Sequence, residues 1–105
     1  MANSKKKLVR ANFRNGVVSR DGDCCKVCGR RTDTLDIHHI TDRNELPNGG
    51  YVPENGIGLC GKCHELAEVW HSSGKTTHVP GYHPDDLYKK IGSSYEKAYE
   101  ASKKL

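Results

Sequence analysis

The chain has 105 residues, of which 34% are apolar, and a mean hydropathy of -0.79, which together exclude a large hydrophobic core. We expect a single domain over residues 1–105, and at this size a bound metal commonly supplements a small core. No apolar run approaches the roughly 18 residues that span a membrane. No hydrophobic stretch follows the basic N-terminus, so we expect a cytoplasmic protein without a signal peptide or a membrane partner. The net charge of +4 permits a polyanionic partner without requiring one.

The first part of the chain predicts a basic arm followed by a helix. Residues 1–8 contain consecutive lysines from Lys5 onward and are expected to form a basic N-terminal arm. This composition suits either a solvated tail or an arm that contacts phosphates, and the sequence leaves both open. Val9, Phe13 and Val17 recur at i, i+4 and i+8, which predicts an amphipathic helix over about residues 9–20.

The central part of the chain predicts two short strands separated by a long loop. Residues 34–38 and 57–59 have the composition of strands. Between them, residues 41–56 are rich in Asn, Gly, Pro and Asp, so we expect a loop there. Loops of this length inside a compact domain are usually functional. Two strands among several helices place the chain in the α+β class.

The remaining residues predict two helical segments around an irregular stretch at 72–83. A helix is expected over 61–71, with Leu66, Val69 and Trp70 on its buried side. The last segment, about 84–105, is expected to be a helical extension that begins at Pro84 and bends at 92–94. Its predicted packing stripe consists of Leu87, Ile91, Tyr95 and Ala98.

Two Cys-x-x-Cys pairs predict a structural zinc site. The pairs are Cys25 with Cys28 and Cys60 with Cys63. Two such turns facing each other provide the tetrahedral four-thiolate shell that Zn²⁺ prefers, and such a closed shell leaves no open position for substrate. The alternatives are chance spacing and redox chemistry. Cys24 is a spare cysteine; pairing it with Cys28 would change the spacing, and symmetry with the second pair favours Cys25.

Between and after the two cysteine pairs lie side chains suited to phosphodiester hydrolysis. That reaction needs a base for water, a cation for the developing charge and rigid placement of both. A His-His pair at the end of a strand and a histidine on a helix provide candidates for the base and the metal ligands.

These motifs resemble those of the HNH endonuclease family, in the form with a four-cysteine zinc site. The resemblance covers about residues 12–70, and the order of the cysteine pairs, the histidines and the asparagine matches the family pattern. It implies a small ββα-metal core, about residues 9–72 here, held by the zinc. The segments that carry it are Arg20-Asp21-Gly22, Cys25–Gly29, Asp36-Ile37-His38-His39-Ile40 and Glu54–His64.

The resemblance also implies roles for individual residues. His39 would be the general base, and His38 and His64 would hold one catalytic divalent metal, which could be Mn²⁺, Ni²⁺, Mg²⁺ or Zn²⁺. Asn55 would orient the loop and the base. Glu68 lies one helical turn beyond His64 and is a further candidate ligand. The implied function is a DNA endonuclease that nicks or cleaves and leaves 5′-phosphate products.

Two other functions compete with the nuclease. A non-catalytic zinc module that binds DNA or a protein would explain the cysteines but would leave the three histidines without a role. A redox dithiol protein would need an exposed thiol of low pKa outside a metal site. As a small HNH protein, this chain also resembles those that phages encode beside packaging genes and those of bacterial defence systems. A protein partner from either kind of system is therefore possible. His71 lies two turns beyond His64 and is a further candidate ligand whose role stays open, and three residues receive no assigned role: Cys24, His78 and His83.

Overall fold

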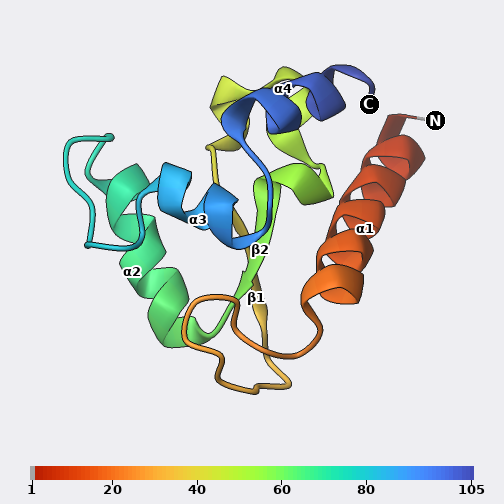
Figure 1. The fold of residues 1–105 in the computed structure, drawn as a ribbon. Helices are drawn as coiled ribbons and strands as arrows, with labels where there is room; N and C mark the ends of the chain where they lie inside the picture. The colour runs from red at the N-terminus through yellow and green to blue at the C-terminus, as the bar shows by residue number, and fades with distance from the viewer. Residues whose placement is uncertain (1) are drawn as a thin grey trace.

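The computed structural model describes residues 2–105, and their side chains from residue 5 onward. It is a small α+β fold in which a two-stranded sheet lies among four helices, as the sequence predicts (Figure 1). No helix in residues 2–105 has both the length and the apolarity to cross a membrane. The regular elements are α1 (Ala2–Asp21), β1 (Asp36–His39), β2 (Gly56–Leu59), α2 (Gly61–Ser72), α3 (Pro84–Lys90) and α4 (Tyr95–Lys103).

The sheet is an antiparallel pair whose glycines let α1 approach closely. Strand β1 pairs with β2 so that His38 lies opposite Ile57 and His39 opposite Gly56. A Cβ atom at Gly56 would lie 2.6 Å from both Phe13 and Val17 of α1, a distance that real Cβ atoms do not show. Glycine at this position therefore places the helix directly against the strand. Figure 1 shows the two strands between α1 and α2.

Helix α1 is longer than predicted, and this corrects the expected N-terminal arm. The helix begins at Ala2, so the described part of residues 1–8 is helical rather than an irregular arm. No proline or glycine precedes Gly16 in this stretch, and lysine is a good helix former, so nothing interrupts the helix before its buried half. Phe13 and Val17 are buried as the periodicity predicts.

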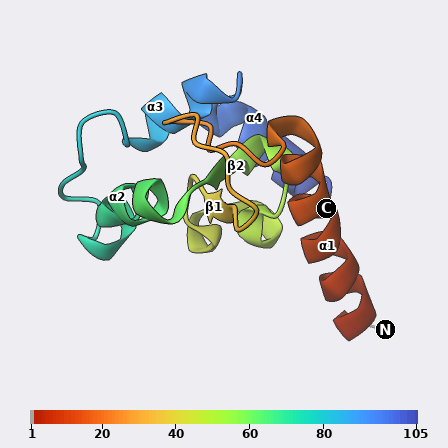
Figure 2. The ribbon, with the colours of Figure 1, turned by 90° about the horizontal axis from the view of Figure 1, so that it is seen from below.

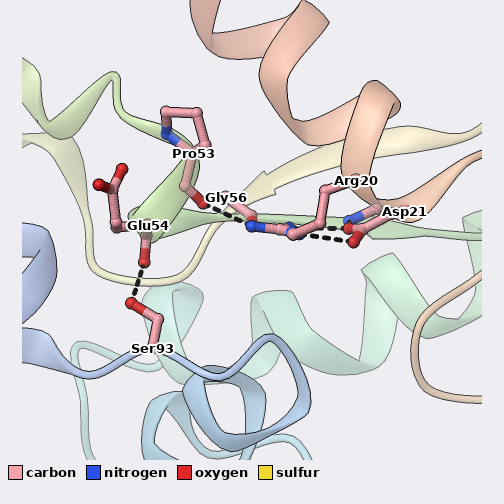
Figure 3. A network of polar contacts seen from close by, with 7 residues as sticks. Arg20, Asp21, Pro53, Glu54, Gly56 and Ser93 are labelled. Carbon is pink, nitrogen blue, oxygen red and sulfur yellow. Dashed lines mark hydrogen bonds and ion pairs between the residues drawn. The ribbon is translucent and has the colours of Figure 1, made fainter.

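The C-terminal end of α1 is held to the loop and to β2 by polar contacts (Figure 3). Asp21 pairs with Arg20 and accepts a hydrogen bond from the Gly58 amide at 2.9 Å. The Arg20 guanidinium also donates to the carbonyl oxygens of Pro53, at 2.8 Å, and Gly56, at 2.6 Å. Asp21 is 9% exposed, and its paired charge satisfies a strand amide that would otherwise be left without a partner.

The central loop is compact rather than extended. Three short 3₁₀ turns occupy it, η1 (Arg43–Glu45), η2 (Pro47–Gly50) and η3 (Pro53–Asn55). Gly50 has φ of +65°, and a Cβ there would lie 2.9 Å from the side-chain nitrogen Nδ2 of Asn55, so glycine is required at this close approach.

Helix α2 packs through the side that carries Leu66 and Trp70, as predicted, but its most buried residues are smaller ones. Its buried residues are Cys63 and Ala67, whereas Leu66, Val69 and Trp70 are only partly buried. The short side chain of Ala67, one turn after Cys63, lets the helix lie close to the core, and the larger apolar residues lie beside that contact. Cys63 and Ala67 lie at the centre of the packed face, and Leu66 and Trp70 lie on the same face with part of each side chain exposed.

The C-terminal extension is two helices, which separate at the predicted bend. Ser93, in the connection, donates a hydrogen bond to the Glu54 carbonyl at 2.8 Å (Figure 3). Leu87 and Ala98 are buried as predicted, but Tyr95 is 46% exposed. Tyr95 is the first residue of α4, and the break before it changes the helix direction, so one continuous stripe cannot extend across both helices.

Candidate functional site

The four predicted zinc ligands come together in one cluster. The Sγ atoms of the two Cys-x-x-Cys pairs all lie within 4.8 Å of one another, close enough to hold a metal ion. The first pair is held to the sheet by the Lys26 amide, which donates to the Gly58 carbonyl at 2.9 Å. The second pair lies at the start of α2. Cys24 is outside the cluster, so the assignment of Cys25 as the ligand agrees with the geometry.

The thiols of this cluster lie in unequal environments. Burial opposes ionisation of Cys25, but backbone hydrogen bonds at Cys28 and Cys60 outweigh it and lower the pKa of Cys25 to about 6. At Cys63 burial dominates and raises the pKa to about 12, although the Tyr82 hydroxyl lies 3.2 Å from its sulfur. Because metals bind the thiolate, a cation is needed to keep all four sulfurs ionised together.

A second group of candidate ligands lies on β1 and α2. His38, His64 and Glu68 each offer one ligand atom, and these atoms lie within 4.8 Å of one another. Glu68 Oε1 lies 3.2 Å from His38 Nδ1 and also 3.2 Å from His64 Nε2. His64 and Glu68 are one turn apart on the same face of α2, which is how two residues of one helix reach a common point.

His38 has the properties of a metal ligand rather than of a charged histidine. It is 2% exposed, and its Nδ1 is buried without a hydrogen-bond partner. Burial, followed by the nearby His71 and His64, lowers the pKa of His38 to about 3. The imidazole is therefore neutral at physiological pH, and its contact with Glu68 is not a salt bridge. An unpartnered buried nitrogen is costly unless something binds it.

Asp36 is a functional candidate that the sequence-based assignment missed. Its Oδ2 lies 3.4 Å from Nδ1 of His64, on the opposite side of the ring from Glu68. A carboxylate in this position orients a metal-binding imidazole and raises its basicity. Asp36 and His38 are two residues apart in β1 and thus share a face of the strand. That alternation is the sequence signal that could have identified Asp36.

His39 is held between aromatic rings from two distant segments. Its ring stacks on Phe13 of α1 at a centroid distance of 4.7 Å and meets the edge of Tyr51 at 4.8 Å. Burial, and then the charge of Arg43, lowers the pKa of His39 to about 4, so the imidazole is neutral and able to accept a proton. His39 is the last residue of β1, and there both neighbouring histidines reach one cleft. Other residues lining that cleft are Asp42, Arg43, His64, Glu68 and His71.

Asn55 closes the base of the long loop. It is fully buried, and its side chain accepts a hydrogen bond from the Thr41 amide at 2.9 Å and donates to the Thr41 carbonyl at 3.0 Å. It also donates to the Gly50 carbonyl at 3.2 Å. Its backbone carbonyl accepts from the Ile40 amide at 2.9 Å, directly after His39. Asn55 thus holds the chain where it leaves the two histidines.

The C-terminal extension contributes a hydroxyl to the Asn55 network. The Tyr88 hydroxyl of α3 donates to Asn55 Oδ1 at 2.7 Å and lies 2.6 Å from the Thr41 hydroxyl. Tyr88 is 2% exposed, and burial raises its pKa to about 12. Nothing in the local sequence links residue 88 to residue 55, so this contact was not predictable without the fold.

We expect Tyr88→Phe to lower the free energy of unfolding by about 1–2 kcal/mol, because the Thr41 hydroxyl then loses a buried partner. Urea unfolding followed by circular dichroism measures this change. The matched control is Tyr95→Phe, which removes an exposed hydroxyl and should leave the urea midpoint unchanged. Equal midpoints for the two variants would contradict the assigned role of Tyr88.

The remaining histidines separate into two groups. His71 lies beside the cleft, with its ring centroid 5.3 Å from that of His38 and its Nε2 3.1 Å from the His39 carbonyl oxygen. His78 and His83 instead form an aromatic group with Trp70 at the end of α2, with ring centroids 4.7 Å apart for Trp70 and His83. His83 also caps α3, since its Nδ1 accepts from the Asp85 amide.

Comparison with known families agrees with this geometry. The family model described as HNH endonuclease matches residues 25–68. This segment is similar to the HNH endonuclease family. Both cysteine pairs, both histidines of β1, Asn55, His64 and Glu68 fall within it, which confirms the family recognised from the motifs. No curated protein and no solved structure gives a significant match to the chain. Phe13 and Tyr88, which support His39 and Asn55, come from helices outside the matched segment.

Proposed function

We propose that this chain is a metal-dependent DNA endonuclease. The observation that carries the proposal is the convergence of His38, His64 and Glu68 beside His39 in one cleft. A purely structural role would not require three ligand groups to meet beside a neutral imidazole. A non-catalytic zinc module would use the cysteine cluster and leave this second group without a function.

The donor set of the second site suits a divalent cation. Two imidazoles and one carboxylate surround a common point, and the buried Nδ1 of His38 has no other partner. A cation bound there would act as a Lewis acid on a phosphodiester oxygen. Asp36 would hold the orientation of His64, and Glu68 would contribute the negative charge that the two neutral rings lack.

The other residues of the cleft divide the remaining tasks. His39 would accept the proton of the attacking water, since its ring is neutral and is held rigidly by Phe13 and Tyr51. Arg43 lines the same cleft and presents a permanent positive charge to a phosphate. Asn55 would keep the end of β1 in place throughout. By the family pattern, the products would carry 5′-phosphates.

Nicking of supercoiled plasmid in the presence of Mn²⁺ tests the proposed activity. The intact chain should convert supercoiled DNA to open circles or linear DNA, and the His38→Ala/His64→Ala double variant should not. His78→Ala is the matched control, because His78 is exposed and lies outside the cleft. An intact, folded chain that binds DNA but does not cut it with any divalent metal would favour the non-catalytic zinc module.

The donor set also predicts which metals support cleavage. Imidazole nitrogen suits Mn²⁺, Co²⁺ or Ni²⁺ better than Mg²⁺, which prefers an all-oxygen shell. We therefore expect the nicking rate with Mn²⁺ or Ni²⁺ to equal or exceed the rate with Mg²⁺ at the same concentration. Rates measured across a series of metal concentrations give the comparison. Strict dependence on Mg²⁺ would mean that oxygen ligands such as Asp36 or Asp42 dominate the site.

A further inference from the structure

We infer that the inward face of α1 continues the cleft as a docking surface for a nucleic-acid backbone. The inference rests on the proposed function, because that function identifies the partner as DNA. We define this docking surface by Lys5, Lys6 and Arg10 of α1 together with the ring of Tyr51. It lies outside the segment matched by the family model.

One face of α1 changes character along its length. Phe13 and Val17 point toward the sheet and are buried. Arg10 and Lys6 precede Phe13 by three and seven residues, so helical periodicity places them on that same face. The same face of α1 is therefore apolar in its C-terminal half, where it packs on the core, and basic in its N-terminal half, where the helix extends past the core. Figure 2 shows the N-terminal half of α1 extending away from the rest of the fold.

The basic part of this face borders a hollow beside the C-terminal end of the chain. The cations Lys5, Lys6 and Arg10 line it together with apolar surface from Val9, Tyr51 and Leu105. Among the residues whose side chains are described, no acidic side chain lines this hollow. A mixture of cationic groups and apolar walls suits a nucleotide chain, in which charged phosphates alternate with sugars and bases.

The hollow is connected to the candidate active site through Tyr51. The Arg10 guanidinium lies over the Tyr51 ring at 5.2 Å from its centroid, and the same ring meets His39 edge-on at 4.8 Å. Arg43, which lines the cleft, donates to the Tyr51 hydroxyl at 3.0 Å. One guanidinium thus lies over the face of the aromatic ring that contacts the proposed base, and another binds the hydroxyl of the same ring.

The positive charge of α1 from Lys5 to Arg14 has no compensating ion pair within the described structure. Before Asp21 the helix carries no acidic residue, and none of its exposed cations from Lys5 to Arg14 makes an ion pair among the described residues. Lysines near a helix N-terminus interact unfavourably with the helix dipole, so this arrangement reduces helix stability. An external anion offsets that effect. Residues 5–10 extend over about 8 Å at 1.5 Å per residue, roughly the axial rise of two nucleotides of one DNA strand.

Equilibrium binding to a labelled DNA duplex, without added divalent metal, tests the docking surface apart from cleavage. We expect Lys6→Gln/Arg10→Gln to weaken binding about tenfold at moderate salt. Loss of two phosphate contacts should also reduce the slope of log affinity against log salt concentration by about 1.8. Lys89→Gln/Lys90→Gln is the matched control on α3, with the same loss of charge at two exposed positions, and should bind as the unaltered chain does. Circular dichroism confirms that both variants keep the fold.

Several results would overturn the inference. Equal affinities and salt slopes for the two double variants would exclude a specific surface on α1. Displacement of DNA by polyglutamate at equal charge concentration would show an acidic-protein site instead of a phosphodiester site. Failure of the nuclease proposal looks different: the chain would bind DNA through α1 with the expected salt slope and would not cut it.

Discussion

A chain in which Cys60 is replaced by serine is expected to lose its cooperative fold. Cys60 is buried between β2 and α2, and its thiol is one of four that converge on a single point. Structural zinc binds small domains with an apparent free energy of about 10–16 kcal/mol. This is comparable to the whole stability of a small protein, about 5–15 kcal/mol. Loss of one ligand is therefore expected to remove most of the free energy of unfolding.

Thermal unfolding and zinc content provide the measurement for Cys60→Ser. We expect no cooperative transition and far less than one zinc per chain, and the same for Cys28→Ser. Cys24→Ser is the control, since Cys24 adjoins Cys25 in sequence but lies outside the cluster. It should keep the full zinc content and an unchanged melting temperature. A Cys60→Ser chain that melts normally would show that the cysteine cluster is not a structural metal site.

The cysteine cluster was predictable because its determinants are local. Two residues between cysteines are enough to define each half of the site, and the cluster contains the four cysteines that this spacing selects. The same holds for His64 and Glu68, which are one turn apart on α2. Helical periodicity alone places them together, whatever the rest of the fold does.

The residues that position His39 and Asn55 were not predictable, because they come from distant segments of the chain. Phe13 stacks on His39 from α1, and Tyr88 reaches Asn55 from α3. Each side chain taken alone has the pattern of an ordinary packing residue, and only the tertiary fold reveals its partner. The most buried residues of α2, Cys63 and Ala67, were not predicted for a related reason. The position of Cys63 is set by the cysteine cluster, and hydrophobic periodicity contains no information about that constraint.

His38 and His39 adjoin in sequence, but their surroundings predict different responses to mutation. His38 Nδ1 lies 3.2 Å from Glu68, within the group of candidate metal ligands, whereas His39 is held between Phe13 and Tyr51. Replacement of His38 by alanine should weaken the binding of the catalytic cation. A higher Mn²⁺ concentration should therefore recover part of the nicking activity.

His39→Ala should instead slow the chemical step by roughly 10²–10⁴, the usual contribution of a positioned base. More Mn²⁺ should not restore it, because the ligands of the cation remain in place. His39→Ala also leaves space between two aromatic rings, so thermal unfolding must confirm that the variant is folded. His39→Gln, which fills more of that space, should be equally slow if the loss is chemical and not structural.

Metal titrations of both variants, measured by plasmid nicking, distinguish the two roles. The expected result is a shifted Mn²⁺ dependence for His38→Ala, and for His39→Ala a low rate at saturation with an unchanged midpoint. Recovery at His39 and none at His38 would mean that the roles are exchanged. If both variants retained full activity, this motif would not be the site of cleavage.

Glu68 is expected to act as a ligand of the same cation. Its carboxylate contacts both His38 and His64. Glu68→Gln removes this negative charge and should shift the Mn²⁺ midpoint in the same direction as His38→Ala.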